Sequence, residues 1–282
     1  MKHWHEATKV MPAILGIDAA WSLNNGSGVA LIAETSAGIW RTLAVASSYA
    51  EFLSIANLSV PSTIREIPAA LVQASRQLAG TDLSMVVADI PLARTVITGR
   101  READNLVSQK FGAQGCSTHT PPKTGLGPVS EGLRDGFAKA GFPLATLQFS
   151  IPCLVETYPH PALLALMQTD YRVKYKARAW KGMPASVAHE KRHEQFQLIA
   201  LKLKGAIDGV SLTRPKERLT STNLKLLEDQ IDALVCAWVG IQILQAKAEP
   251  YGDENAAIWL PVNIPAKRTL APLIDREAVE IA

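Results

Sequence analysis

Three apolar stretches of this sequence each end in a carboxylate. They are residues 13–18, 84–89 and 151–156, and their terminal acids are Asp18, Asp89 and Glu156. An apolar run of this length, bounded by turn residues, predicts a strand buried on both faces. Because an unpaired charge is costly out of water, we expect each acid to lie where its strand leaves the sheet. Strands that share a direction bring such ends to one edge, where open α/β sheets place their sites.

The remaining pattern predicts further strands and helices around these three strands. A glycine-bearing turn after Asp18 indicates a hairpin, and the apolar repeat in residues 222–246 indicates a largely buried helix. Residues 114–127 are rich in Gly, Pro, Ser and Thr and are expected to form a long loop. The predicted strands are residues 13–18, 29–33, 39–45, 84–89, 151–155 and 256–260. The predicted helices are residues 63–79, 100–111, 130–140, 161–167, 186–204 and 222–246.

Length and composition favour one large soluble domain. The chain has 282 residues, of which 48% are hydrophobic, enough for a sizeable core. Its three cysteines show no paired spacing, which is typical of a reducing cytosol. We find no signal peptide and no run long enough to span a membrane, so we expect a cytoplasmic protein. The expected organisation is one domain over residues 11–265, in which residues 170–218 form a basic helical insertion, followed by a C-terminal tail over residues 266–282.

A fourth acid, Asp232, lies in the predicted helix 222–246, just before its apolar half. Two carboxylates about 4 Å apart repel by roughly 4 kcal/mol at an effective dielectric constant near 20. If the four acids converge, they cannot all stay ionised without cations. Oxygen ligands in this number suit Mg²⁺ or Mn²⁺, and two such ions about 3.5–4 Å apart can clamp the attacking and leaving oxygens in phosphoryl transfer. The sequence therefore predicts a two-metal site, with Asp18 and Asp89 flanking the ions and the other two acids completing the shell.

Five short blocks of the sequence resemble the successive motifs of one family. They are Gly16-Ile17-Asp18-Ala19-Ala20, Ala88-Asp89-Ile90-Pro91, Arg100-Arg101-x-x-Asp104, Glu156-Thr157-Tyr158-Pro159-His160 and Asp232-Ala233-Leu234-Val235-Cys236-Ala237-Trp238. In this order they are similar to the blocks of domain of unknown function 429, a family classed as predicted nucleases. The resemblance implies a ribonuclease H-like fold: a mixed five-stranded sheet, its first three strands antiparallel, flanked by helices.

The same resemblance implies roles for single residues. It carries over Asp18, Asp89, Glu156 and Asp232 as metal ligands, and Asp104 as a residue that supports them from behind. In addition, Asp229-x-x-Asp232 resembles the paired late acids of Holliday-junction resolvases, which have the same type of fold.

Basic and aromatic residues indicate where a substrate would bind. Residues 170–218 hold 12 Lys and Arg against 5 Asp and Glu, and the first of these basic residues alternate with aromatic ones. Since Lys and Arg neutralise phosphates and aromatic faces stack on bases, we expect a nucleic-acid substrate, with Lys176 in contact with a phosphate. A solvated basic face is the alternative. Arg100 and Arg101 are expected to form a second phosphate clamp. His160 is a candidate for contact with the leaving oxygen, or a cap of the next helix.

Three other functions remain open from the sequence. His189-Glu190-x-x-His193 matches the zinc-protease pattern, although the charges around it favour an exposed helix. The turn at residues 18–28 is similar to the phosphate hairpin of sugar kinases and actin-like ATPases, although their second hairpin is missing. A catalytically inactive nucleic-acid-binding protein is the third, although retention of all four acids argues against it. The sequence thus favours a metal-dependent phosphodiesterase, and specifically a nuclease.

Overall fold

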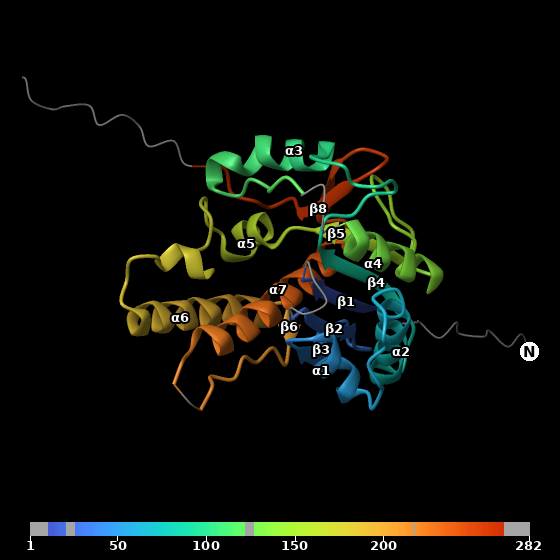
Figure 1. Cartoon of the computed structure of the whole chain (residues 1–282), viewed down its shortest axis with the longest axis horizontal. Coiled ribbons are helices and arrows are strands. Elements are labelled where there is room, and N and C mark those ends of the chain that lie inside the picture. Colours follow the sequence, from blue (N-terminus) through green and yellow to red (C-terminus); the bar gives the residue numbers. More distant parts are fainter. Residues whose placement is uncertain (1–10, 21–25, 122–126, 217, 268–282) are drawn as a thin grey trace, which may run out of the picture.

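A mixed β-sheet of eight strands lies at the centre of the part of the chain that the structure describes, residues 11–20, 26–121, 127–216 and 218–267 of a computed structural model (Figure 1). The strands are β1 (Ala13–Asp18), β2 (Gly28–Glu34), β3 (Trp40–Ala46), β4 (Leu83–Asp89), β5 (Cys153–Thr157), β6 (Ile207–Asp208), β7 (Ala248–Gly252) and β8 (Ala257–Pro261). Their order is β6-β3-β2-β1-β4-β5-β8-β7. The strands β1, β4, β5 and β8 run parallel, whereas β2 is antiparallel to both β1 and β3.

The strands β1 to β5 agree with the expected architecture, β8 corresponds to the strand predicted at residues 256–260, and β6 and β7 are additional. The strands β1 to β5 take the order β3-β2-β1-β4-β5, and the first three are antiparallel. The predicted number of five is wrong, because the described residues also form β6, β7 and β8. β6 has only two residues, and β7 carries Pro250, which a strand tolerates at a sheet edge. The chain therefore has a mixed α/β fold with an eight-stranded sheet in its described part.

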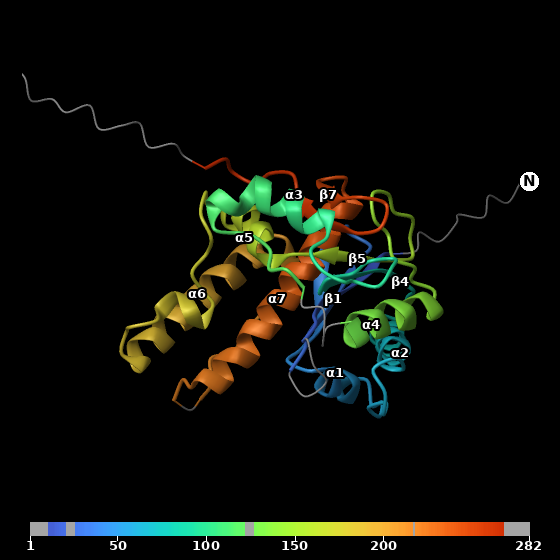
Figure 2. The ribbon, with the colours of Figure 1, turned by 45° about the horizontal axis from the view of Figure 1, so that its top comes forward.

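Helices cover both faces of this sheet (Figures 1 and 2). They are α1 (Tyr49–Ile55), α2 (Ile67–Ala79), α3 (Glu102–Phe111), α4 (Gly127–Lys139), α5 (Pro159–Met167), α6 (Ala185–Lys204) and α7 (Ser221–Leu244). The helices α1, α2 and α4 pack on one face, α5, α6 and α7 pack on the other, and α3 covers β7 and β8. In the residues that are described, no helix combines the length and the apolar character needed to cross a membrane.

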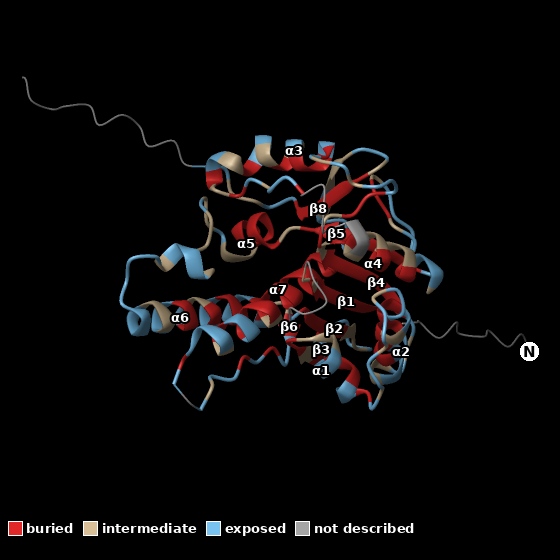
Figure 3. Ribbon diagram, in the orientation of Figure 1, coloured by how far each residue is buried: buried red, intermediate tan, exposed pale blue. Residues whose placement is uncertain are grey.

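Helix α7 lies against the centre of the sheet and approaches it closely. A Cβ atom added to Gly16 of β1 would lie 2.1 Å from the carbonyl oxygen of Ala233, and one added to Gly28 of β2 would lie 1.9 Å from that of Asp229. Only glycine allows this approach of strand and helix backbones. The C-terminal half of α7 is buried in the core, whereas its N-terminal half extends outward beside α6 (Figures 2 and 3). The glycines therefore fix the position of the helix that carries Asp229 and Asp232.

The basic stretch 170–218 is part of the main core. It contributes α6, which packs on α7, and β6, which pairs with β3. Phe196, Ile199 and Leu203 of α6 are buried in the same apolar cluster as the centre of α7. The predicted C-terminal tail, residues 266–282, lies almost entirely outside the described residues.

Candidate active site

The first two acids lie side by side at the ends of neighbouring strands. Asp18 of β1 and Asp89 of β4 are register partners in the parallel pair. Side chains alternate between the faces of a sheet, so Asp18 shares a face with Ile14 and Gly16, and Asp89 shares one with Val87. Ile14, Gly16 and Val87 contact α7 or belong to its apolar cluster. Both acids therefore lie on the side of the sheet that α7 covers.

Helix α7 adds two acids to this pair. Asp229 and Asp232 are one turn apart, so their side chains share one side of the helix. The carboxyl groups of Asp18 and Asp229 influence each other's pKa, and Asp232 interacts electrostatically with both Asp18 and Asp89. We call Asp18, Asp89, Asp229 and Asp232 the acidic cluster. It joins two strand ends with one helix, as the sequence predicted for three of its members.

The acidic cluster holds more negative charge than the protein around it neutralises. Burial, opposed by the charge of Lys176, raises the pKa of Asp18 to about 7 and that of Asp232 to about 6. Burial raises the pKa of Asp89 well above its ordinary value, and the charges of Asp18 and Asp232 add to this shift. The carboxylate of Asp89 makes no hydrogen bond or ion pair with any residue that the structure describes. Crowded oxygen ligands with excess negative charge suit hard divalent cations.

The geometry of the cluster is not that of a closed metal site. Within the described ranges, no group of three His, Cys, Asp or Glu side chains is already arranged around a common ion position. The oxygen donors suit Mg²⁺ or Mn²⁺, but their carboxylates would have to turn toward a shared ion.

Two lysines and a tyrosine contact the acidic cluster. Lys176 forms ion pairs with Asp232 and, at 3.2 Å, with Glu228, while the hydroxyl of Tyr175 donates a hydrogen bond of 2.8 Å to Asp232. Lys225 forms an ion pair with Asp229 from the same helix. Tyr175 lies in the basic, aromatic stretch where the sequence predicted substrate binding, but its contact with Asp232 was not predicted. Lys225 was missed, although its spacing of four residues from Asp229 on a predicted helix is one that pairs charges.

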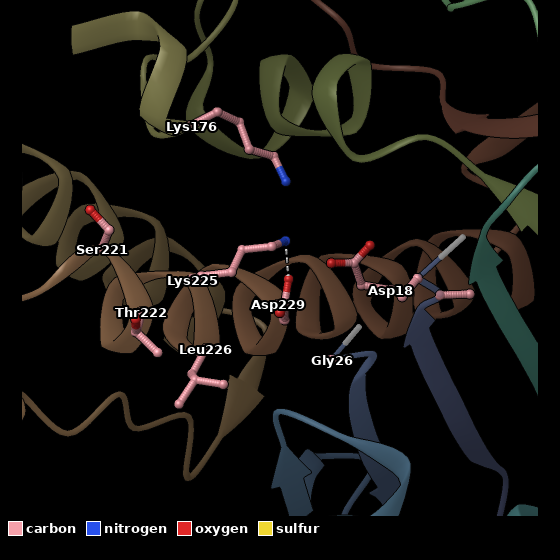
Figure 4. Close-up of a pocket in the computed structure, with 10 residues that line it drawn as sticks. Asp18, Gly26, Lys176, Ser221, Thr222, Lys225, Leu226 and Asp229 are labelled. Atoms are coloured by element: carbon pink, nitrogen blue, oxygen red, sulfur yellow. Dashed lines mark hydrogen bonds and ion pairs between the residues drawn. The ribbon is translucent and has the colours of Figure 1, made fainter. Parts of the chain in front are cut away.

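A pocket of about 700 Å³ opens in front of these groups (Figure 4). Asp18, Asp229 and Gly26 line it beside the sheet, and Lys176 and Lys225 extend into it from opposite sides. The hydroxyl-bearing residues Ser221 and Thr222, at the start of α7, line its far part, beside Leu226. The pocket is large enough for a small organic ligand or a few units of an extended polymer.

Glu156 lies apart from the acidic cluster, in contrast to the sequence-based expectation. Its register partner on β4 is Ala88 and not Asp89, so its side chain lies on the opposite face of the sheet. Both of its oxygens accept hydrogen bonds from Arg101, at 2.6 and 2.8 Å, and one also accepts from the backbone of Leu92. Glu156 and Asp89 both line a smaller pocket of about 80 Å³, and the charge of Glu156 makes a small contribution to the raised pKa of Asp89. Arg101 therefore balances the charge of Glu156.

Arg101 has no free donor for a phosphate. Its five N–H groups are all used, by Asp104, Glu156 and the carbonyl oxygen of Leu92. Asp104 is buried and binds Arg101 through both oxygens, so it supports Glu156 from behind through the arginine. The buried position of Arg101 and its two carboxylate partners therefore argue against the predicted phosphate clamp.

Arg100 is exposed but also engaged with the protein. Its guanidinium donates hydrogen bonds to the carbonyl oxygens of Asp104 and Thr118 and to the side chains of Asn105 and Ser108. It thus fastens the start of the predicted loop 114–127 to α3. The tip of that loop, residues 122–126, lies outside the described residues.

Removal of the Arg101 charge should lower the stability of the folded protein. In Arg101→Met, Glu156 keeps its buried position but loses the counter-ion that the described residues provide, which should lower the free energy of unfolding by about 3 kcal/mol at pH 8. The pKa of Glu156 is already raised by burial and would rise further, so the loss should shrink at pH 5, where Glu156 takes up a proton. Urea denaturation at both pH values measures this loss.

Arg41→Met, which breaks the exposed pair with Asp208, is the control and should change stability by less than about 0.5 kcal/mol. An equal loss at both pH values would contradict the assignment.

His160 lies in the first turn of α5, where Tyr158 is the capping residue. Its ring is buried between Tyr158 and Tyr175, and one ring nitrogen contacts Arg172. The other, Nδ1, has no hydrogen-bond partner in the described residues. Burial and the charge of Arg172 lower the pKa of His160 well below its ordinary value, so the ring is neutral. It holds Arg172 and the tyrosines in place and does not face the large pocket.

The zinc-protease pattern does not form a metal site in this fold. His189 contacts the carbonyl oxygen of Leu219 at 2.9 Å and the hydroxyl of Ser221 at 3.2 Å. His193 lies 3.3 Å from the amide nitrogen of Gln197. His189 therefore joins α6 to the start of α7, His193 contacts a residue of its own helix, and no third ligand accompanies them among the described residues.

A comparison with known families agrees with the resemblance found in the sequence. Residues 16–256 match the model of the family described as "Protein of unknown function (DUF429)". Neither the curated proteins nor the solved structures contain a match to the chain. The match spans β1 to the turn before β8, including every residue of the acidic cluster. The chain therefore belongs to the DUF429 family.

Proposed function

We propose that the protein is a metal-dependent phosphodiester hydrolase, a nuclease that acts on RNA or DNA, built on a ribonuclease H-like sheet. One observation carries the proposal: two register partners at strand ends and two acids of a single helix form one cluster whose negative charge is not neutralised. Such a cluster suits a pair of Mg²⁺ or Mn²⁺ ions. The strand order of β1 to β5 supports the fold assignment.

The ligands that we propose differ in one residue from those expected from the sequence. Asp18, Asp89 and Asp232 would hold the ions together with Asp229, which replaces Glu156. Bound divalent ions would stabilise the charge that develops on the attacking and leaving oxygens. The protein itself fixes the carboxylates: the parallel register sets Asp18 beside Asp89, and the Tyr175 hydroxyl orients Asp232. The pocket in front of the cluster would hold the substrate.

A cleavage panel tests this function. The purified protein, with Mg²⁺, Mn²⁺ or EDTA, is incubated with labelled single-stranded and double-stranded DNA and RNA, and products are resolved on gels. We expect cleavage of at least one substrate that needs a divalent ion and stops in EDTA. Saturable ATP binding without cleavage would instead favour the kinase-like alternative. Equal nucleic-acid affinity of the wild type and Asp18→Asn, with no cleavage by either, would favour a non-catalytic binding protein.

A further inference from the structure

Two lysines bind the acidic cluster from opposite sides of the large pocket (Figure 4). Lys176 approaches from the segment before α6 and contacts Asp232, whereas Lys225 extends from α7 and contacts Asp229. The side chain of Lys176 is 29% exposed and that of Lys225 is 57% exposed. Each ammonium group therefore sits on an acid of the cluster while its stem borders open space.

The acids that these lysines contact are those that we propose as metal ligands. A lysine ammonium group that pairs with a carboxylate occupies the position that a divalent metal ion would take. It carries one positive charge instead of two, and it does not gather several oxygen ligands around itself as a divalent ion does. A divalent ion that binds Asp229 and Asp232 must therefore displace both lysines. Both side chains are at least partly exposed and have four rotatable bonds, which allows them to move aside.

Glu228 does not need the lysines. It lies 3.2 Å from Lys176 and 3.4 Å from Lys225, but the buried Arg192 also pairs with it at 3.0 Å. When the lysines leave, Arg192 still balances its charge. The lysines are thus the movable counter-ions of the site, and Arg192 is the fixed one.

Both displaced lysines would remain in the pocket. The two residues line the same space of about 700 Å³ as Asp18 and Asp229, one on each side. A polynucleotide drawn toward cations at the cluster would pass between them. Lysine binds phosphate as a compact point charge and needs no fixed geometry, which suits a side chain that moves between two partners.

We propose that Lys176 and Lys225 occupy the acidic cluster in the cation-free protein and exchange it for substrate phosphates when divalent ions bind. The proposal rests on the proposed function and assigns its substrate-binding residues. It adds Lys225, on the opposite side of the pocket, to Lys176. Each lysine then has opposite effects on the two ligands: it weakens the binding of the ion and strengthens the binding of the nucleic acid.

The test measures both affinities without relying on cleavage. Binding of Mn²⁺ alone is followed by electron paramagnetic resonance, and binding of a short single-stranded oligonucleotide in Ca²⁺ by fluorescence anisotropy across a salt series. Lys176→Met and Lys225→Met should each bind Mn²⁺ about tenfold more tightly than the wild type, because a competing charge is gone. Each should also bind the oligonucleotide more weakly, with a salt slope smaller by about 0.7.

Two further variants sharpen the result. Lys225→Arg keeps a positive charge beside Asp229 and should therefore bind Mn²⁺ no more tightly than the wild type. Lys110→Met removes a lysine that pairs with Glu249 outside the pocket, and it should change neither affinity. If Lys176→Met fails to fold, as judged by circular dichroism, the more exposed Lys225 carries the test.

Two outcomes separate this proposal from the proposed function. Folded variants with unchanged or weaker Mn²⁺ binding, beside a wild type that binds the ion, would overturn the exchange and leave the metal site intact. A wild type that binds no Mn²⁺ would overturn the metal site and the exchange together.

Discussion

Asp89→Asn should produce a folded protein that has lost its catalysis. The side chain of Asp89 makes no hydrogen bond or ion pair with the described residues, yet it interacts with Asp18 and Asp232 in the acidic cluster. Loss of its charge should remove ion binding and lower turnover by about 1,000-fold or more, which corresponds to about 4 kcal/mol in the activation barrier. The measurements are cleavage of the best substrate in the panel and Mn²⁺ binding.

The same substitution should stabilise the cation-free protein at pH 8. The folded-state pKa of Asp89 is raised above its ordinary value of 3.8, so the cost of its charge to folding grows as the pH rises from that ordinary value to the raised one. Asparagine removes this cost, and urea denaturation should therefore show a gain at pH 8 that shrinks at pH 5. Asp208→Asn, at an exposed ion pair far along the sheet, is the matched control and should change neither turnover nor stability measurably. Full turnover in Asp89→Asn would show that the cluster is not the catalytic site.

Gly28→Ala should cost about 3 kcal/mol of unfolding free energy and also impair the site. The added methyl group would lie 1.9 Å from the carbonyl oxygen of Asp229, a backbone atom that cannot turn aside. Helix α7 must then move away from β2 and carry Asp229 away from Asp18. Thermal unfolding should occur about 8 °C lower, with weaker Mn²⁺ binding.

A glycine with free space around it provides the control for that result. No heavy atom lies within 4 Å of a Cβ atom added to Gly99, so Gly99→Ala should alter stability by less than about 0.5 kcal/mol. If Gly28→Ala were as mild as Gly99→Ala, α7 would not be held by backbone contact with the strand.

The strands and helices that surround the site could be predicted because their sequence signals are local. Apolar runs that stop at an acid gave β1, β4 and β5 to within a few residues, and the helical repeat gave α7. The short helix α1 and the edge strands β6 and β7 were missed. β6 has two residues, and β7 is only partly buried, so neither carries a clear apolar pattern.

The position of Glu156 was missed because the prediction aligned the three strands only by the acids at their C-terminal ends. The three strand ends do meet at one edge of the sheet. Successive side chains of a strand alternate between its two faces, however, so a carboxylate faces α7 only if it stands at a position whose side chain is on that face. Glu156 aligns with Ala88, one residue before Asp89, and this shift turns it to the other face. The register between paired strands decides on which face a side chain lies, and the sequence of a single strand does not determine that register.

The charged partners of the acids were also beyond sequence reasoning. Arg101 looks like a free phosphate ligand because Glu156, which occupies it, is 55 residues away. Lys176 was expected near a phosphate, and the fold brings it to Asp232, 56 residues away. In both cases the spacing shows a positive charge near an acidic motif, and only the tertiary structure shows which acid it neutralises.

Helix α7 is both the main packing element of one face and the carrier of Asp229 and Asp232. Each residue advances an α-helix by about 100°, so a single insertion between Asp232 and Gly240 would turn the acids away from the strands while the apolar end kept its contacts. An insertion in α7 should therefore abolish the function even in a protein that still folds. We expect homologous chains to vary in the loops around the pocket and to keep the length of this helix constant.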